Sequence, residues 1–152
     1  MNPACVIGAG SSGIAIAKGL KDTSVDFDCF DMCSVVGGNW AFGSGWSAAY
    51  RTLHINSYCR EVQYSDFPMP ADVSDYPHHD EIAAYFKDYV DHFGLRRHIT
   101  FDTAVERAEP KESDGWTVRL STGETCQYSY VDVDYRSCEF RRGARPPEGG
   151  HF

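Results

Sequence analysis

The sequence predicts an α/β fold with a parallel sheet, and the order of segments in its first 31 residues carries this prediction. An apolar run, Ala4–Ile7, stops at a glycine turn, and the turn opens a run of good helix formers, Ser11–Lys21. A second short strand segment, Phe27–Phe30, then ends at Asp31. Strand, glycine turn, helix and strand form the first half of a βαβ nucleotide-binding unit, so we expect a Rossmann-type domain.

The composition is that of one globular domain. The 152 residues are 42% hydrophobic and 14% aromatic, which is enough for a core. The net charge of −8 argues against nucleic acid or an anionic membrane as partner and favours a small-molecule substrate. Since the chain has no basic leader and no apolar run near the length of about 18 residues that spans a membrane, we expect a cytoplasmic protein.

A long segment from Cys33 to Pro77 shows neither helical nor strand periodicity. It is rich in Gly, Ser, Pro, Tyr and Trp, so we expect a wrapped loop with short turns. A loop of this length in a compact domain is uncommon unless it binds something. Its aromatic side chains therefore suggest a ligand: Trp40, Phe42, Trp46, Tyr50, Tyr58, Tyr64 and Phe67.

The periodicity returns after this loop. Apolar residues at helical spacing predict a helix over Asp80–Phe93, with Asp80 as its cap and Gly94 at its end. Three strands are expected to follow, the last two forming a small β excursion: His98–Phe101, Ala104–Ala108 and Trp116–Leu120.

The glycine turn has the spacing Gly-x-Gly-x-x-Gly, at Gly8, Gly10 and Gly13. One glycine permits the tight turn, one lets the backbone approach a pyrophosphate, and one lets helix and strand pack closely. Asp31 follows Gly13 by 18 residues, close to the spacing of a carboxylate that binds ribose hydroxyls. The motif predicts an adenine dinucleotide, and both NAD and FAD fit it.

Other chemistries find little support. None of the four lysines has a tyrosine four residues before it, which a short-chain dehydrogenase needs. The six cysteines are scattered, so we expect free thiols and no redox pair of the disulfide reductase kind. His78 and His79 are adjacent and lack a ligand set, so no metal site is expected.

Three further segments carry a family resemblance. Gly37–Trp40 reads Gly-Gly-Asn-Trp, and Tyr50–Asn56 and Tyr64–Pro70 follow it. Together with the glycine turn and Asp31, they closely resemble the N-terminal FAD-binding part of flavin-containing monooxygenases. The resemblance extends from residue 4 to about residue 127.

The resemblance implies an NADPH-dependent monooxygenase. In such a protein NADPH reduces FAD, the reduced flavin takes up O2 as a flavin hydroperoxide, and this species oxygenates a soft nitrogen or sulfur nucleophile or a ketone. Asn56 matches a family asparagine beside the flavin and nicotinamide, which makes it the catalytic candidate. The cofactor-binding residues that the resemblance implies are Gly8, Gly10, Ser11, Ser12, Gly13, Asp31, Gly38, Asn39 and Trp40.

Some of these residues also fit a purely structural role. Trp40 and Trp46 are large apolar rings that also fit a core. Judged without the resemblance, Asn56 fits a turn residue that satisfies its own backbone.

The chain also departs from the family pattern. It lacks a second Gly-x-Gly-x-x-Gly motif for NADPH, and after Tyr128 the resemblance stops abruptly. We therefore expect a partial FAD-binding domain over residues 1–127 and a non-family tail over 128–152, either disordered or frame-shifted. We accordingly expect no turnover by this chain alone, and the alternative function is that of a truncated, non-catalytic dinucleotide-binding remnant.

Overall fold

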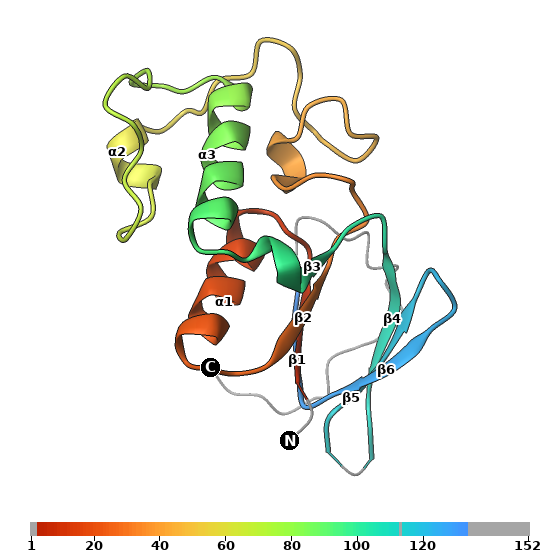
Figure 1. Cartoon of the computed structure of the whole chain (residues 1–152). Coiled ribbons are helices and arrows are strands. Elements are labelled where there is room, and N and C mark those ends of the chain that lie inside the picture. The colour runs from red at the N-terminus through yellow and green to blue at the C-terminus, as the bar shows by residue number, and fades with distance from the viewer. Residues whose placement is uncertain (1–2, 113, 134–152) are drawn as a thin grey trace, which may run out of the picture.

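The computed structural model describes residues 3–112 and 114–133. Two helices cover one face of a parallel sheet, and a small antiparallel sheet covers the other face (Figure 1). This is the α/β, Rossmann-type arrangement that the sequence predicts.

The parallel sheet has the strand order β3-β2-β1-β7. Its strands are β1 (Ala4–Ile7), β2 (Phe27–Phe30), β3 (Ile99–Thr100) and β7 (Tyr130–Val133). In the centre, Ala4 of β1 pairs with Phe27 on one side and with Tyr130 on the other. The carboxyl ends of β1 and β2 therefore meet at one edge of the sheet, where the glycine turn and Asp31 follow them.

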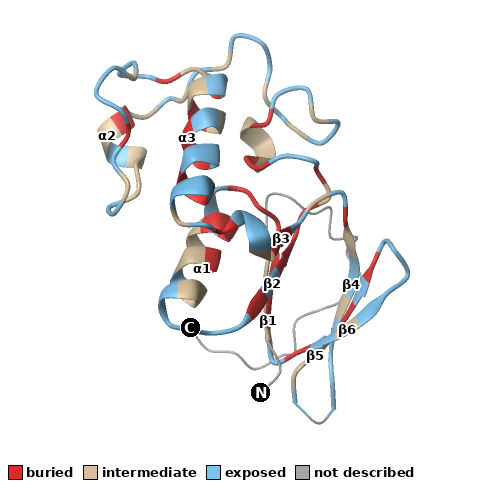
Figure 2. Cartoon of the chain, in the orientation of Figure 1, coloured by how far each residue is buried: buried red, intermediate tan, exposed pale blue. Residues whose placement is uncertain are grey.

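Strand β1 is buried on both faces, which explains its uninterrupted apolar sequence. Ala4 and Val6 pack into the cluster beneath the helices, whereas Cys5 and Ile7 pack into the cluster beneath the antiparallel sheet. Figure 2 shows this buried centre in red. Alternate side chains of one short strand thus join the two halves of the core.

Helices α1 (Ser11–Asp22) and α3 (His79–His92) cover the same face of the sheet. Helix α3 begins one residue earlier than expected. Its N-cap is His78, whose backbone N–H donates to the Glu81 carboxylate at 2.8 Å, so the expected cap at Asp80 was wrong. The side chain of Asp80 instead accepts from the backbone N–H of Glu81 at 2.9 Å.

The antiparallel sheet has the order β4-β5-β6, with β4 at Val105–Pro110, β5 at Trp116–Leu120 and β6 at Thr125–Tyr128. The first two strands were expected and β6 was not. The alternation of β6 extends over only four residues, and only Tyr128 in it is buried, so its sequence signal is short.

The segment between β2 and α3 is mostly irregular, as expected. It contains two short helices, η1 (Gly38–Trp40) and α2 (Cys59–Val62). A further single turn, η2 (Arg96–His98), leads into β3.

The parallel sheet continues past residue 127, where the sequence suggested that the domain ends. Tyr128 is buried, and β7 pairs with β1 over four residues. Tyr130 is 55% exposed, and this partly polar edge strand gives a weak sequence signal. The expected disordered tail from Arg136 onward lies outside the described residues.

Of the five described cysteines, Cys5, Cys29, Cys33 and Cys59 are buried and Cys126 is partly exposed. Across the described ranges, no helix is long and apolar enough to cross a membrane.

Candidate functional site

The glycine turn lies at the carboxyl end of β1. The backbone N–H of Gly8 donates to the Phe30 carbonyl at 2.8 Å, and Gly8 has φ +99°, a region that favours glycine. A Cβ atom on Gly13 would lie 1.9 Å from the Gly8 carbonyl oxygen. These two glycines therefore bring the first turn of α1 directly against the end of β1, as the motif predicts.

The N-terminus of α1 is open to an anion. Gly10 is the N-cap, and no side chain caps the helix there. Ser11 and Ser12, the first two helical residues, are exposed. The first-turn N–H groups and the positive end of the helix dipole thus lie where a pyrophosphate would bind.

Asp31 is held beside this turn. One carboxylate oxygen accepts from the Ala9 N–H at 2.5 Å, and the other accepts from the Cys33 N–H at 2.7 Å. The side chain is buried, and a carboxylate is the acceptor type that binds ribose hydroxyls at this position of a dinucleotide-binding unit.

A narrow hollow beside Asp31 marks the same place. It is lined by residues that end β1 and β2 and residues that precede β4, including Gly8, Asp31 and Thr103. Its volume of 10 Å³ suits a single water molecule, so a nucleoside bound here has to cover or widen it.

The Gly-Gly-Asn-Trp segment lies against the glycine turn. The Gly37 N–H donates to the Ala9 carbonyl at 3.1 Å, and Gly37 and Gly38 have φ +126° and +52°. Trp40 packs partly into the core and lines a pocket of 580 Å³ together with His79. The Asn39 carbonyl accepts from the Ser47 hydroxyl at 2.6 Å.

Asn56 is exposed on the loop that precedes α2. The neighbouring backbone is fixed to the start of α3, because the Ile55 N–H donates to Pro77 O at 2.9 Å and the His79 N–H donates to Leu53 O at 2.9 Å. The described hydrogen bonds connect the glycine turn with Asp31 and Gly37, but they do not connect Asn56 with the turn.

The adjacent histidines hold the start of α3. The two ring nitrogens of His78 contact the Asp80 carboxylate at 2.6 Å and the Arg51 carbonyl at 2.7 Å. Both partners are acceptors, and the Asp80 carboxylate raises the pKa of His78. His79 is buried with its ring 4.8 Å from that of Phe42. In the described ranges, no group of three candidate ligands is placed to hold a metal ion.

Sequence reasoning missed the backbone donors of Ala9 and Cys33. Both N–H groups hold the Asp31 carboxylate, yet their side chains carry no sign of this role. The available signal is position, because Ala9 is the first variable residue of the glycine motif and Cys33 lies two residues after the carboxylate.

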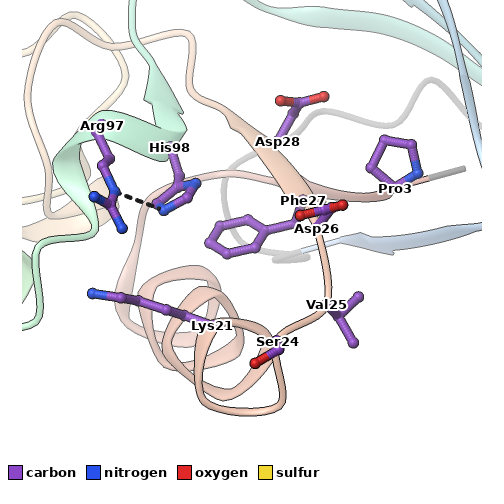
Figure 3. A pocket seen from close by; sticks show the side chains of 9 residues that line it. All are labelled: Pro3, Lys21, Ser24, Val25, Asp26, Phe27, Asp28, Arg97 and His98. Carbon is purple, nitrogen blue, oxygen red and sulfur yellow. Dashed lines mark hydrogen bonds between the residues drawn. The ribbon is translucent and has the colours of Figure 1, made fainter.

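A larger hollow of 450 Å³ lies elsewhere (Figure 3). Its lining includes Pro3, Asp26 and Phe27, which mark the amino ends of β1 and β2, together with Lys21 and His98. Open α/β sheets bind nucleotides at the carboxyl ends of their strands, so this hollow lies at the opposite edge from the candidate site.

Comparison with known proteins agrees with this geometry. The family model described as flavin-binding monooxygenase-like matches residues 2–132. The chain belongs to this flavin-binding monooxygenase-like family. It is 35% identical over 126 residues to dimethylaniline monooxygenase [N-oxide-forming] 4 of Mus musculus, covering 77% of this chain and 22% of that protein. It is 36% identical over 105 residues to flavin-containing monooxygenase 1 of Homo sapiens, covering 66% of this chain and 20% of that protein.

Solved structures of flavin-binding monooxygenase-like proteins share the fold. A steroid monooxygenase bound to NADP matches with a TM-score of 0.79 and 28% identity, over 88% of this chain and 25% of that one. An open form of cyclohexanone monooxygenase matches with a TM-score of 0.76 and 29% identity, over 87% and 26%. The chain thus spans between 20% and 26% of the length of these relatives.

Proposed function

We propose that this chain binds FAD, as the FAD-binding portion of an NADPH-dependent monooxygenase. The observation that carries the proposal is the placement of the Asp31 carboxylate 2.5 Å from the Ala9 N–H, inside the glycine turn that opens α1. A site for a negatively charged pyrophosphate and an acceptor for ribose hydroxyls thus lie at one edge of the sheet.

The residues present fit the cofactor. The first-turn N–H groups of α1 would hold the pyrophosphate, with Gly8 and Gly13 keeping the turn tight and Gly10, Ser11 and Ser12 forming its mouth. Asp31 would accept from the adenosine ribose. The Gly38–Trp40 turn would lie on the flavin side, since Gly37 is bonded to Ala9 within the same site.

When bound, FAD would supply the redox chemistry by which NADPH and O2 oxygenate a small-molecule substrate. The chain itself would bind and orient the cofactor, and the aromatic side chains of residues 40–67 would limit the access of water. Asn56 is proposed as the residue beside the reacting centre, because an amide donates and accepts hydrogen bonds without changing charge. The proposed substrate class is a soft nitrogen or sulfur nucleophile, or a ketone.

FAD titration of the purified chain tests the proposal directly. We expect saturable binding, and we expect Asp31→Asn to raise the Kd for FAD by about tenfold or more, since hydrogen bonds to a charged acceptor contribute about 1.5–3 kcal/mol. The matched control is Asp26→Asn, which makes the same change of charge at the opposite edge of the sheet. A wild-type chain that does not bind FAD would refute the proposal.

NADPH consumption with an amine or sulfide substrate is measured separately. It distinguishes a catalytic chain from a chain that binds FAD without turnover, and it leaves the affinity test unaffected.

A further inference from the structure

A short turn formed by Tyr64, Ser65, Asp66 and Phe67 lies between α3 and α1. We refer to it as the 64–67 turn. Its end residues form an isolated antiparallel bridge, and the Phe67 N–H donates to the Tyr64 carbonyl at 3.2 Å. The resemblance to the monooxygenase family rests partly on this segment. The roles of the glycine motif and Asp31 do not explain what the segment does.

Helix α3 fixes one side of the 64–67 turn. The Tyr64 N–H donates to the Tyr85 hydroxyl at 2.7 Å, and that hydroxyl donates to the Phe67 carbonyl at 2.5 Å. The Tyr64 ring also lies 4.3 Å from the Tyr89 ring. Tyr85 and Tyr89 are both buried, so the turn rests on rigid side chains.

The other side of the turn contacts α1 at two points. The Tyr64 hydroxyl donates to the Ser11 carbonyl at 2.5 Å, and the Lys18 ammonium lies 2.6 Å from the Asp66 carboxylate. Ser11 and Lys18 are seven residues, about two helical turns, apart and therefore share one face of the helix. The turn thus links α3 to the first turn of α1.

The contact at Ser11 involves one particular peptide group. The carbonyl of Ser11 and the N–H of Ser12 belong to the same peptide unit, and a donor on the carbonyl polarises the N–H of that unit. Because no side chain caps α1, the Ser12 N–H is one of the first-turn donors open to a ligand.

We propose that Tyr64 is a positioning residue for the pyrophosphate end of the site. Its hydroxyl orients and strengthens the Ser12 N–H donor by bonding to the Ser11 carbonyl, while Tyr85 and Tyr89 hold the ring in place. This inference rests on the proposed FAD binding, and it assigns part of the phosphate affinity to a residue more than 50 positions from the glycine motif.

The test compares ligands with and without phosphate on Tyr64→Phe, which keeps the packed ring and removes only the hydroxyl. We expect the Kd values for FAD and ADP to rise about 3- to 10-fold, the effect of one hydrogen bond, while the Kd for adenosine stays unchanged. A merely structural loosening of the site would weaken adenosine as much as ADP, so equal losses would overturn the proposal. Unchanged ADP affinity would overturn it as well.

The matched control is Asp66→Asn. It removes the second contact of the same turn with α1 but leaves the hydrogen bond to Ser11, so all three Kd values should match those of the wild type.

An amide NMR spectrum without ligand provides an independent measurement. The Ser12 N–H resonance should move upfield in Tyr64→Phe, while that of Gly19 in the last turns of α1 stays in place. A wild-type chain that binds neither FAD nor ADP would refute the proposed function itself, whereas binding that Tyr64→Phe leaves intact would refute only the role of Tyr64.

Discussion

The parallel sheet and the loop of residues 33–77 are held in different ways. Adjacent strands of the sheet exchange backbone hydrogen bonds, and their side chains fill a core on both faces. The loop has no continuous ladder; it is held by scattered backbone hydrogen bonds, such as those of Gly37 to Ala9 and Ile55 to Pro77, and by single side chains that bond to its backbone. The Tyr85 hydroxyl, for example, accepts from the Tyr64 N–H and donates to the Phe67 carbonyl. The Arg60 guanidinium donates to the Met69 carbonyl at 2.8 Å, and the His78 ring contacts the Arg51 carbonyl.

Because of this difference, the two regions tolerate different substitutions. In the sheet region the hydrogen bonds do not depend on side-chain identity, so substitutions act through volume and close approach. In the loop the removal of one polar atom takes a hydrogen-bond partner away from backbone groups that are in part shielded from water. Both regions contribute to the candidate site, the sheet through the glycine turn and Asp31 and the loop through Gly38–Trp40 and Tyr64.

The largest effect is expected in the sheet region, from Gly13→Ala. The new Cβ would lie 1.9 Å from the Gly8 carbonyl oxygen, so the helix must move away from β1. We expect the free energy of unfolding in urea to fall by about 3 kcal/mol, with loss of FAD binding.

Gly19→Ala is the control in the same helix. A Cβ there meets no atom within 4 Å, so the substitution should raise the stability by about 0.5–1 kcal/mol through helix propensity. If the two alanines had the same effect, close packing at the glycine turn would not explain the result for Gly13.

The next effect concerns the loop. Tyr85→Phe removes the hydroxyl that bonds to the Tyr64 N–H and the Phe67 carbonyl. We expect the free energy of unfolding in urea to fall by about 1–3 kcal/mol. Tyr50→Phe is the control, because Tyr50 is 59% exposed and its loss of a hydroxyl should be neutral. A neutral Tyr85→Phe would show that the loop does not depend on this bond.

The smallest effects are opposite pH dependences of two histidines, one bonded to the loop and one beside the sheet. At the N-cap of α3, Asp80 raises the pKa of His78, so the stabilising contribution of His78 is complete below the ordinary value of 6.5 and is lost as pH rises through the raised pKa. The decrease in melting temperature that His78→Gln causes should therefore be larger at pH 6 than at pH 9.

His98, beside the sheet, has the opposite sign. It stacks on Phe27 at 4.6 Å and accepts from Arg97 (Figure 3). Burial, and then the charges of Arg97 and Lys21, lower the pKa of His98, so the fold favours the neutral ring and loses stability as pH falls through 6.5. The melting temperature of His98→Gln, measured relative to that of the wild type, should therefore rise as the pH is lowered. The same pH trend in both variants would contradict these assignments.

Much of the fold could be predicted because its signals are local. The β1–turn–α1–β2 unit is encoded in 27 contiguous residues whose glycines, helix formers and apolar runs agree with one another. Strands β6 and β7 escaped prediction since each has exposed positions and gains its order by pairing with β5 or β1. The cap of α3 was misassigned because Asp80 and His78 both occur near the helix start, and only the backbone geometry distinguishes them.

In the candidate site, too, some features could be predicted from the sequence and others could not. The sequence by itself determined the glycine turn, the acidic residue after β2 and the family, because these depend on residue type at fixed spacing. Only the tertiary structure decided that Ala9 and Cys33 hold the Asp31 carboxylate, and that Tyr64 reaches the Ser11 carbonyl across 53 residues. Such contacts join segments that chain folding brings together, and a hydrogen bond depends on distance and direction in space rather than on spacing along the sequence.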